Sequence, residues 1–318
     1  MTVVLPPPKT RESDSTPQRA TEASGASEAG RLTDIGRLVV HCADRPGIVA
    51  AISRFLADHD ANIIESDQST SDPSGGDFFL RMVFRKRDLQ AEINAMAGLF
   101  ESSLVEKLGV VNWSLTTTAK SRRVAVMVSK YDHCLVDLLW RARRGELPAQ
   151  IGLVISNHPD LAAEVRSFGV PFVHIPVTRD NKAEAEAKQL ELLRDNFDLV
   201  VLARYMQILS GDFLDKIGCP VINIHHSFLP AFAGAGPYDR AKTRGVKLVG
   251  ATAHYVTEDL DEGPIIEQDV VRVSHRDDVA TLERRGADVE RSVLHRAVLW
   301  HCEDRVLRQE NTTVVFAR

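Results

Sequence analysis

The chain is 318 residues long, carries a formal net charge of −5 and is 44% hydrophobic. This length predicts about two domains, because single domains commonly hold about 100–200 residues. The net charge is negative, and the sequence has no basic run interleaved with aromatic residues. Both observations argue against a broad nucleic-acid-binding surface. No apolar run approaches the length of about 20 residues that a membrane helix needs.

The cysteines and the missing motifs exclude further classes of protein. The cysteines stand far apart in the sequence, at Cys42, Cys134, Cys219 and Cys302. This spacing favours reduced thiols in a cytoplasmic protein over a disulfide framework or a zinc site. The sequence has no G-x-x-x-x-G-K-[ST], no G-x-G-x-x-G after a strand and no H-E-x-x-H. The motifs typical of nucleotide-phosphate binding and of zincin-type hydrolysis are therefore missing. We expect neither a metal nor a bound cofactor.

The first part of the chain differs in composition from the rest. Residues 1–33 are rich in Pro, Ser, Thr, Glu and Ala, with almost no large apolar side chains after Leu5. Such a segment cannot bury enough surface to offset the entropy of ordering it, so we expect a disordered tail. It also lacks the basic start and sustained apolar stretch of a signal peptide.

From residue 34 the pattern becomes that of a small domain ending at residue 116. Apolar residues alternate at strand spacing or recur at helical spacing. We expect a strand at 38–42, a helix from 48, strands near 62–68 and 78–84, a helix over 89–100 and a strand at 110–116. Asp44 is expected to cap the first helix, with Pro46 in its first turn. The order βαββαβ predicts a ferredoxin-like α/β domain.

Residues 117–121 are predicted to be a linker, and a second domain is predicted over 122–318. Its strands are expected near 124–128, 151–155, 171–175, 199–202, 221–226, 248–256, 265–273 and 313–316. Helical patterns alternate with the earlier strands, and a long final helix carries Val293 and Leu294. This alternation predicts a doubly wound, mostly parallel sheet with helices on both faces. The loop from Ala231 to Tyr238 is long enough that we expect it to cover a site.

One strand of this second domain carries the candidate chemistry. Asn223 and His225 are two positions apart near its end, so both side chains project to the same face of the sheet. Ligands of open α/β sheets bind at the carboxyl ends of strands. The alternative is a histidine that simply packs beneath a loop, which a second polar group on the same face makes less favourable. His226 must point the other way, so the two adjacent histidines form a poor metal site.

An acidic turn downstream supplies a third group. Asp261 precedes Gly263-Pro264 at the start of a strand, beside the strand that carries His254. If the turn folds over the sheet end, Asp261 faces His225. An amide donor that stabilises an oxyanion contributes about 3 kcal/mol, and a carboxylate can orient an imidazole and help to move a proton. These three groups suit the attack of a bound nucleophile on a carbonyl. The alternative is that the acidic turn is only a solvated loop, which would show the same spacing in the sequence.

Two segments resemble known families, the first of them the ACT domain. The segment Asp44-Arg45-Pro46-Gly47-Ile48-Val49 resembles the D-R-P-G-I/L-V signature of these amino-acid-binding regulatory modules. The resemblance implies an effector site at Asp44, Arg45, Pro46, Gly47 and Ile48. It also implies a homo-oligomer, because ACT sheets commonly pair between subunits. A tight turn that binds nothing is the alternative.

The second resemblance is to the 10-formyltetrahydrofolate-dependent formyltransferases. The segment from Asn223 to Pro230 and the segment from Leu260 to Ile266 are similar to the N-I-H-x-S-x-L-P and L-D-x-G-P-I motifs of that family. The resemblance covers roughly residues 121–318 and implies that Asn223, His225 and Asp261 are the catalytic set. It further implies a folate pocket, with Arg204, Tyr205, Met206, Ile208, Leu209 and His254 as substrate-binding residues.

An ACT module fused to this catalytic domain resembles the deformylases of 10-formyltetrahydrofolate. That resemblance implies hydrolysis to formate and tetrahydrofolate, with the formate feeding purine synthesis and the reaction balancing one-carbon pools. The turn at 129–134 has no glycine to let backbone N–H groups surround an acceptor's phosphate, which leaves water as the nucleophile. Gly236, Asp239-Arg240 and the segment 68–71 depart from the family pattern. Transfer of the formyl group to an amine, or a catalytically idle sensor, are the alternatives.

Overall fold

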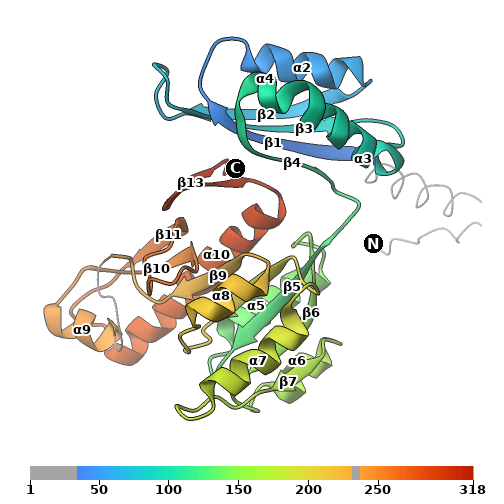
Figure 1. Cartoon of the computed structure of the whole chain (residues 1–318). Coiled ribbons are helices and arrows are strands. Elements are labelled where there is room, and N and C mark those ends of the chain that lie inside the picture. Colours follow the sequence, from blue (N-terminus) through green and yellow to red (C-terminus); the bar gives the residue numbers. More distant parts are fainter. Residues whose placement is uncertain (1–33, 231–236, 318) are drawn as a thin grey trace, which may run out of the picture.

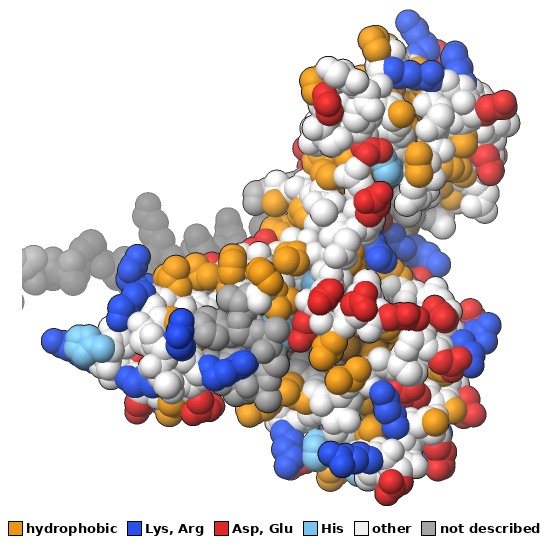
Figure 2. Space-filling view, turned by 60° about the vertical axis from the view of Figure 1, so that its left-hand side comes forward, with side chains coloured by type: hydrophobic (Ala, Val, Ile, Leu, Met, Phe, Trp, Pro, Cys, Tyr) orange, Lys and Arg blue, Asp and Glu red, His pale blue; other side chains and the backbone are white. Residues whose placement is uncertain are grey.

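The computed structural model describes residues 34–230 and 237–317. The expected tail, 1–33, lies outside the described residues. In Figure 1 a smaller layer of sheet and helices stands above a larger α/β body, and a single segment after β4 connects them. The space-filling view in Figure 2 shows the same two lobes with a narrower waist between them. In the described part of the chain, no helix is both long and apolar enough to cross a membrane.

The upper lobe is a four-stranded antiparallel sheet with helices on one face, in the strand order β2-β3-β1-β4. Its elements are β1 (Ile35–Ala43), α2 (Ile48–Asp58), β2 (Asn62–Thr70), β3 (Asp77–Arg85), α3 (Leu89–Phe100), the π-helical turn η1 (Glu101–Val105), α4 (Glu106–Leu108) and β4 (Val110–Thr117). The predicted βαββαβ order is therefore confirmed. The additional helical residues after α3 close the same core through Leu104 and Leu108.

The start of α2 differs from the expectation. Its cap is Gly47, whose φ of 94° lies in the left-handed region, and no side chain caps the helix. Asp44 is three residues too early, and its carboxylate instead accepts a hydrogen bond from the Thr70 hydroxyl at 2.7 Å. The prediction of an Asp44 cap was wrong because the turn needs a left-handed residue directly before the helix, and glycine adopts that conformation without a Cβ penalty.

The lower lobe contains a seven-stranded sheet in the order β11-β10-β9-β8-β5-β6-β7. The strands are β5 (Arg122–Val128), β6 (Ala149–Ser156), β7 (Phe172–His174), β8 (Leu199–Ala203), β9 (Val221–His225), β10 (Leu248–Tyr255) and β11 (Ile265–Arg272). Neighbouring strands from β7 to β9 run parallel, and β10 is antiparallel to both of its neighbours. The predicted mostly parallel sheet is confirmed.

Helices cover both faces of this sheet. They are α5 (His133–Arg143), α6 (Ala162–Ser167), α7 (Lys182–Leu193), α8 (Gly211–Ile217), α9 (Pro237–Arg244) and α10 (Val279–Cys302). One apolar core joins the sheet to α5 and α10, and a second joins it to α7 and α8. Alternate strand residues face the two cores, as a parallel sheet buried on both sides requires.

Two elements were not expected from the sequence. The segment Ala231 to Tyr238 was predicted as a covering loop; its first six residues lie outside the described residues, and α9 begins at Pro237. The chain closes on a hairpin, β12 (Val306–Gln309) and β13 (Thr312–Val315), where a single strand was expected. Figure 1 shows this hairpin between α10 and the open face of the upper sheet.

The two lobes are joined by polar contacts. Arg81 of β3 is 2% exposed, and its Nε and Nη2 donate to the carbonyl of Glu303 at 3.3 and 3.2 Å. Arg37 of β1 donates to the carbonyl of Cys302, at the end of α10. Asp304 pairs with Arg37 and with Arg122 at 3.4 and 2.7 Å. The turn after α10 is thereby fixed to the upper sheet.

Candidate active site

The strand register brings the predicted catalytic groups together. In the antiparallel pair of β9 and β10, His254 lies directly opposite Asn223, and Thr252 lies opposite His225. Asn223 and His225, which share a face of β9, both line one cavity, and His226 lines it as well. The turn before β11 then carries Asp261 over the end of these strands. The expected meeting of Asn223, His225 and Asp261 at the sheet end is what the structure describes, with His254 among them.

The hydrogen bonds of His254 fix its tautomer. Its Nδ1 lies 3.0 Å from the carbonyl of Tyr255, which can only accept, so Nδ1 carries the hydrogen. In the neutral ring Nε2 is then an acceptor, and the amide of Asn223 donates to it at 3.2 Å. Burial lowers the pKa of His254, which favours this neutral form. His254 thus holds the Asn223 amide group in a defined orientation.

His225 and Asp261 form a second pair. Nδ1 of His225 lies 3.2 Å from Oδ2 of Asp261, and the other carboxylate oxygen is 3.8 Å from Nε2 of His254. The hydrogen bond from His225 lowers the pKa of Asp261, although its partial burial acts in the opposite direction. With Nδ1 bound to the carboxylate, Nε2 of His225 is directed away from Asp261. That atom is buried and has no hydrogen-bond partner within the described parts of the chain.

The backbone of the acidic turn is adapted to this geometry. Asp261 has a φ of 60°, in the left-handed region that Asp tolerates better than most residues. Gly263 lies so close to the carbonyl oxygen of Tyr255 that a Cβ there would overlap it. The absent side chain lets the turn pack onto β10, and this contact sets the position of Asp261 over His225.

A cavity of about 280 Å³ opens in front of these groups. All six residues predicted to bind substrate line it: Arg204, Tyr205, Met206, Ile208, Leu209 and His254. Four of these side chains divide into two pairs. Tyr205 and Leu209 are buried in the core beneath the cavity, whereas Met206 and Ile208 are about half exposed beside it, at 54% and 58%. Their roles in binding stay a prediction.

Arg204 turns away from the open part of the cavity. Its φ is 62°, and its guanidinium lies 3.3 Å from the carboxylate of Glu290 and 4.7 Å from the centre of the Tyr131 ring. Glu290 of α10 is 2% exposed and also accepts hydrogen bonds from His133 and Tyr238, both at 2.8 Å. Arg204 therefore lines the inner wall of the cavity, and a buried ion pair with Glu290 holds its guanidinium there.

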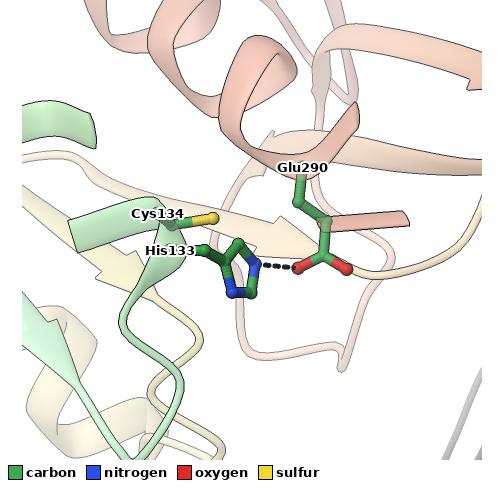
Figure 3. Close-up of side chains that lie close together, drawn as sticks. All are labelled: His133, Cys134 and Glu290. Atoms are coloured by element: carbon green, nitrogen blue, oxygen red, sulfur yellow. Dashed lines mark hydrogen bonds and ion pairs between the residues drawn. The ribbon is translucent and has the colours of Figure 1, made fainter. Parts of the chain in front are cut away.

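Figure 3 shows Glu290 facing His133, with Cys134 beside them. Their possible ligand atoms lie within 4.8 Å of one another, the spacing of a metal site. Burial would raise the pKa of Glu290, but the hydrogen bond from His133 and the charge of Arg204 together lower it. Burial raises the pKa of Cys134 well above its usual value, which favours the thiol over the metal-binding thiolate. The carboxylate is thus already neutralised by Arg204, and the cluster fits an ion-pair network better than a cation site.

Sequence reasoning missed this network, and it did not place His226 beside it. Burial, followed by the charge of Arg204, lowers the pKa of His226 to about 4, so it is neutral at ordinary pH. One sequence signal was present: Glu290 lies on the apolar stripe of α10, four residues after Gly286 and four before Leu294. Gly286 leaves room for the Tyr238 hydroxyl, which a Cβ at that position would overlap.

The predicted effector residues lie at the turn between β1 and α2. Gly47 adopts a positive φ with open space where a Cβ would stand. Arg45 donates to the carbonyl of Lys107, and Asp44 is bound to Thr70. Ile48 is 2% exposed and belongs to the core of the upper lobe. Pro46 is exposed. A ligand at this turn stays a prediction.

Comparison with known proteins identifies the family. The Formyl transferase family matches residues 122–298, and the ACT domain family matches residues 36–101. A formyltetrahydrofolate deformylase from Mycobacterium bovis is 62% identical over 283 residues, covering 89% of this chain and 91% of the relative. The formyltetrahydrofolate deformylase of Bacillus subtilis is 54% identical over 284 residues, covering 89% and 94%.

A solved structure agrees over nearly the whole chain. The crystal structure of a formyltetrahydrofolate deformylase from Pseudomonas syringae pv. tomato matches with a TM-score of 0.84 at 45% identity, covering 93% of this chain and 99% of that one. The upper lobe is thus an ACT domain and the lower lobe a formyl transferase domain. With both lobes matched in sequence and in structure, the chain belongs to the formyltetrahydrofolate deformylase family.

Proposed function

We propose that this protein hydrolyses 10-formyltetrahydrofolate to formate and tetrahydrofolate. The observation that carries the proposal is the arrangement of His225 between Asp261 and the cavity. Its Nδ1 is 3.2 Å from the carboxylate, and its buried Nε2 has no partner among the residues described. An imidazole oriented by a carboxylate with its second nitrogen free is suited to exchanging a proton with a bound reactant. The deformylase names of the relatives support the same reaction.

In the first step, water attacks the formyl carbon at the inner end of the cavity. A C–O bond forms, and the proton of the water passes to Nε2 of His225. Asp261 stabilises the resulting imidazolium, because its carboxylate already faces Nδ1. The carbonyl oxygen becomes an oxyanion, which the Asn223 amide group and the imidazolium stabilise. A preorganised donor of this kind contributes about 3 kcal/mol.

In the second step the tetrahedral intermediate breaks down. The C–N10 bond breaks, and N10 takes the proton from the His225–Asp261 pair, so that tetrahydrofolate leaves neutral at that nitrogen. Formic acid loses a proton to solvent and leaves as formate. His254 serves as a positioning residue, since its neutral Nε2 holds the Asn223 amide. Every step uses a side chain of the site, so the mechanism we propose requires no metal or cofactor.

Water as the nucleophile is supported by the loop after β5. Tyr131 lies under the guanidinium of Arg204, and His133 donates to Glu290. These side chains are engaged with the inner wall of the cavity, and the loop has no glycine that would expose several backbone N–H groups to an anion. A phosphate-bearing amine acceptor therefore finds no cradle at this loop.

We further propose an amino-acid effector for the ACT domain, a homo-oligomer and a cytoplasmic location. The left-handed Gly47 at the β1–α2 turn supports close approach of a ligand to the backbone. The edge strands β2 and β4 carry exposed Ile64 and Val111, which supports pairing of sheets between subunits. The free cysteines support a reducing compartment.

The test is release of formate and tetrahydrofolate from 10-formyltetrahydrofolate by the purified protein, with no amine present. We expect steady release that is lost in Asn223→Ala and in His225→Ala, while both variants still bind folate. Full activity in either variant would refute the site. Turnover that begins only when an amine acceptor is added would show a transferase, and folate binding without turnover under both conditions would show a sensor.

A further inference from the structure

A further histidine, His226, lines the folate cavity next to His225. The prediction that it points away from His225 was wrong, because β9 ends at His225 and the alternation of a strand stops there. Thr252, opposite His225 in β10, holds the bend that follows. Its hydroxyl donates to the carbonyl of Ser227 at 2.9 Å and accepts from the backbone N–H of Leu229 at 3.0 Å. This bend brings His226 to the cavity that holds the catalytic set.

The ring of His226 is close to the ring of His225 and is not engaged elsewhere. The centres of these two rings are 5.3 Å apart, and the ring of Tyr238 lies 6.2 Å from His226. Within residues 34–230 and 237–317, neither nitrogen of His226 takes part in a hydrogen bond, and neither is sealed from solvent. Both nitrogens are therefore available to a small molecule in the cavity.

The surroundings of His226 keep its ring neutral. Its burial and the charge of Arg204 lower its pKa, against the opposing charges of Glu290 and Asp261. In a neutral imidazole one nitrogen carries no hydrogen and accepts a hydrogen bond, whereas an imidazolium can only donate. His225 has the same property at its Nε2, because its Nδ1 faces the carboxylate of Asp261. The inner end of the cavity thus presents two neighbouring acceptors of hydrogen bonds.

We propose that His226 accepts a hydrogen bond from the attacking water and, with His225, fixes the direction from which that water reaches the formyl carbon. The inference rests on the proposed function and adds a residue to it. One O–H of the water donates to Nε2 of His225, which takes this proton as the C–O bond forms. The other O–H donates to His226, and its proton stays on the oxygen. Two hydrogen bonds of about 2.7–3.2 Å let one water join acceptors up to about 6 Å apart, and the 5.3 Å between the ring centres allows this.

Two acceptors select water over other nucleophiles. A water molecule has two hydrogens and two lone pairs, so a single hydrogen bond leaves it free to rotate. When both hydrogens are held, a lone pair stays directed at the carbon, and orientation of this kind lowers the barrier. An amine nitrogen has a single lone pair and is the stronger nucleophile, so its attack depends less on a second contact. His226 is therefore a residue that directs the reaction toward hydrolysis.

The first test compares variants of the full chain by formate release from 10-formyltetrahydrofolate. His226→Phe keeps an aromatic ring against Tyr238 and removes both nitrogens. We expect kcat to fall by about 10²-fold, the effect of misplacing a reactant by about 1 Å, while KM changes little. His226→Gln restores an acceptor on a side chain of similar reach and should recover a large part of the loss. His174→Phe, at an exposed histidine of β7, is the matched control and should keep the full rate.

The second test separates a role toward water from a role in packing. Hydroxylamine is added as a competing nucleophile, and the reaction without enzyme is subtracted. Its nitrogen bonds to the formyl carbon, the C–N10 bond breaks, and one proton of that nitrogen passes through His225 to N10, which gives formohydroxamic acid and tetrahydrofolate. We expect the ratio of formohydroxamate to formate to rise by about tenfold or more in His226→Phe. Equal losses in both reactions would show a packing role and overturn the proposal.

A crystal structure of the unmodified protein with tetrahydrofolate tests the contact itself and needs no variant to fold. We expect an ordered water within about 3.2 Å of both Nε2 of His225 and a nitrogen of His226. A site without that water would overturn the proposal, as would normal hydrolysis in His226→Phe. An unmodified protein that binds tetrahydrofolate but produces neither formate nor formohydroxamate would instead refute the proposed function.

Discussion

Asp261 and Glu290, two of the acidic residues around the cavity, have different neighbours, and we expect them to have different roles. Asp261 faces His225 beside the cavity, and Glu290 faces Arg204 behind its wall. Asp261→Asn keeps a residue that tolerates the left-handed backbone but removes the charge that stabilises an imidazolium. We expect turnover to fall by about 10²–10⁴-fold, the range for general acid–base groups. Formate release measures it, and Glu262→Gln, exposed in the same turn and outside the lining of the cavity, should retain activity. Equal loss in both variants would count against a specific role for Asp261.

Glu290 is predicted to matter for stability. Replacing it with Ala leaves the guanidinium of Arg204, 7% exposed, without its carboxylate partner. Removing one member of a buried ion pair costs about 3–5 kcal/mol, so the midpoint of urea unfolding should move to markedly lower concentration. Glu283→Ala, on an exposed face of the same helix, should cost far less. A small effect of Glu290→Ala would mean that water or a neighbouring side chain compensates Arg204.

At the scale of elements, the active site depends on how closely a turn packs on a strand. Gly263→Ala would place a Cβ against the carbonyl oxygen of Tyr255, so the turn must move and carry Asp261 away from His225. We expect formate release to fall by about tenfold or more, because a displacement of about 1 Å can cost about 10²-fold in rate. Gly98→Ala in α3 has open space around it and should leave the rate unchanged while stabilising the helix by roughly 0.5–1 kcal/mol. A normal rate in Gly263→Ala would show that the turn is positioned by other contacts.

The helices and strands show which parts of the fold could be predicted from the sequence. Periodicity predicted β9 because Val221, Ile222 and Ile224 form a short apolar run, and α10 because its apolar stripe is long. It did not predict α9, which starts directly after a glycine- and proline-rich segment. The Glu290 network was out of reach for a different reason. Its partners His133 and Arg204 are 157 and 86 positions away, so only the fold reveals the contact.

For the whole molecule, two partly buried histidines predict how stability depends on pH. Burial lowers the pKa of His226 and of His301 from 6.5 to about 4. In the unfolded chain both regain the ordinary value, so between pH 6.5 and 4 the unfolded state binds more protons than the folded state. The free energy of unfolding is therefore fully retained above pH 6.5 and falls as the pH drops toward 4. Each histidine contributes a slope of about 1.4 kcal/mol per pH unit in that window.

The slope can be separated from other acid effects by removing one histidine. Nδ1 of His301 is hydrogen-bonded to the hydroxyl of Tyr255 at 2.8 Å, so His301→Asn will lower stability at every pH. The informative quantity is the change of the free energy of unfolding with pH. We expect this slope to decrease by about 1.4 kcal/mol per pH unit between pH 6.5 and 4. Urea unfolding at a series of pH values measures it, with the exposed His174→Asn as the matched control. An unchanged slope in His301→Asn would mean that His301 is already protonated in the folded protein, and that the carboxylate of Asp304 offsets its burial.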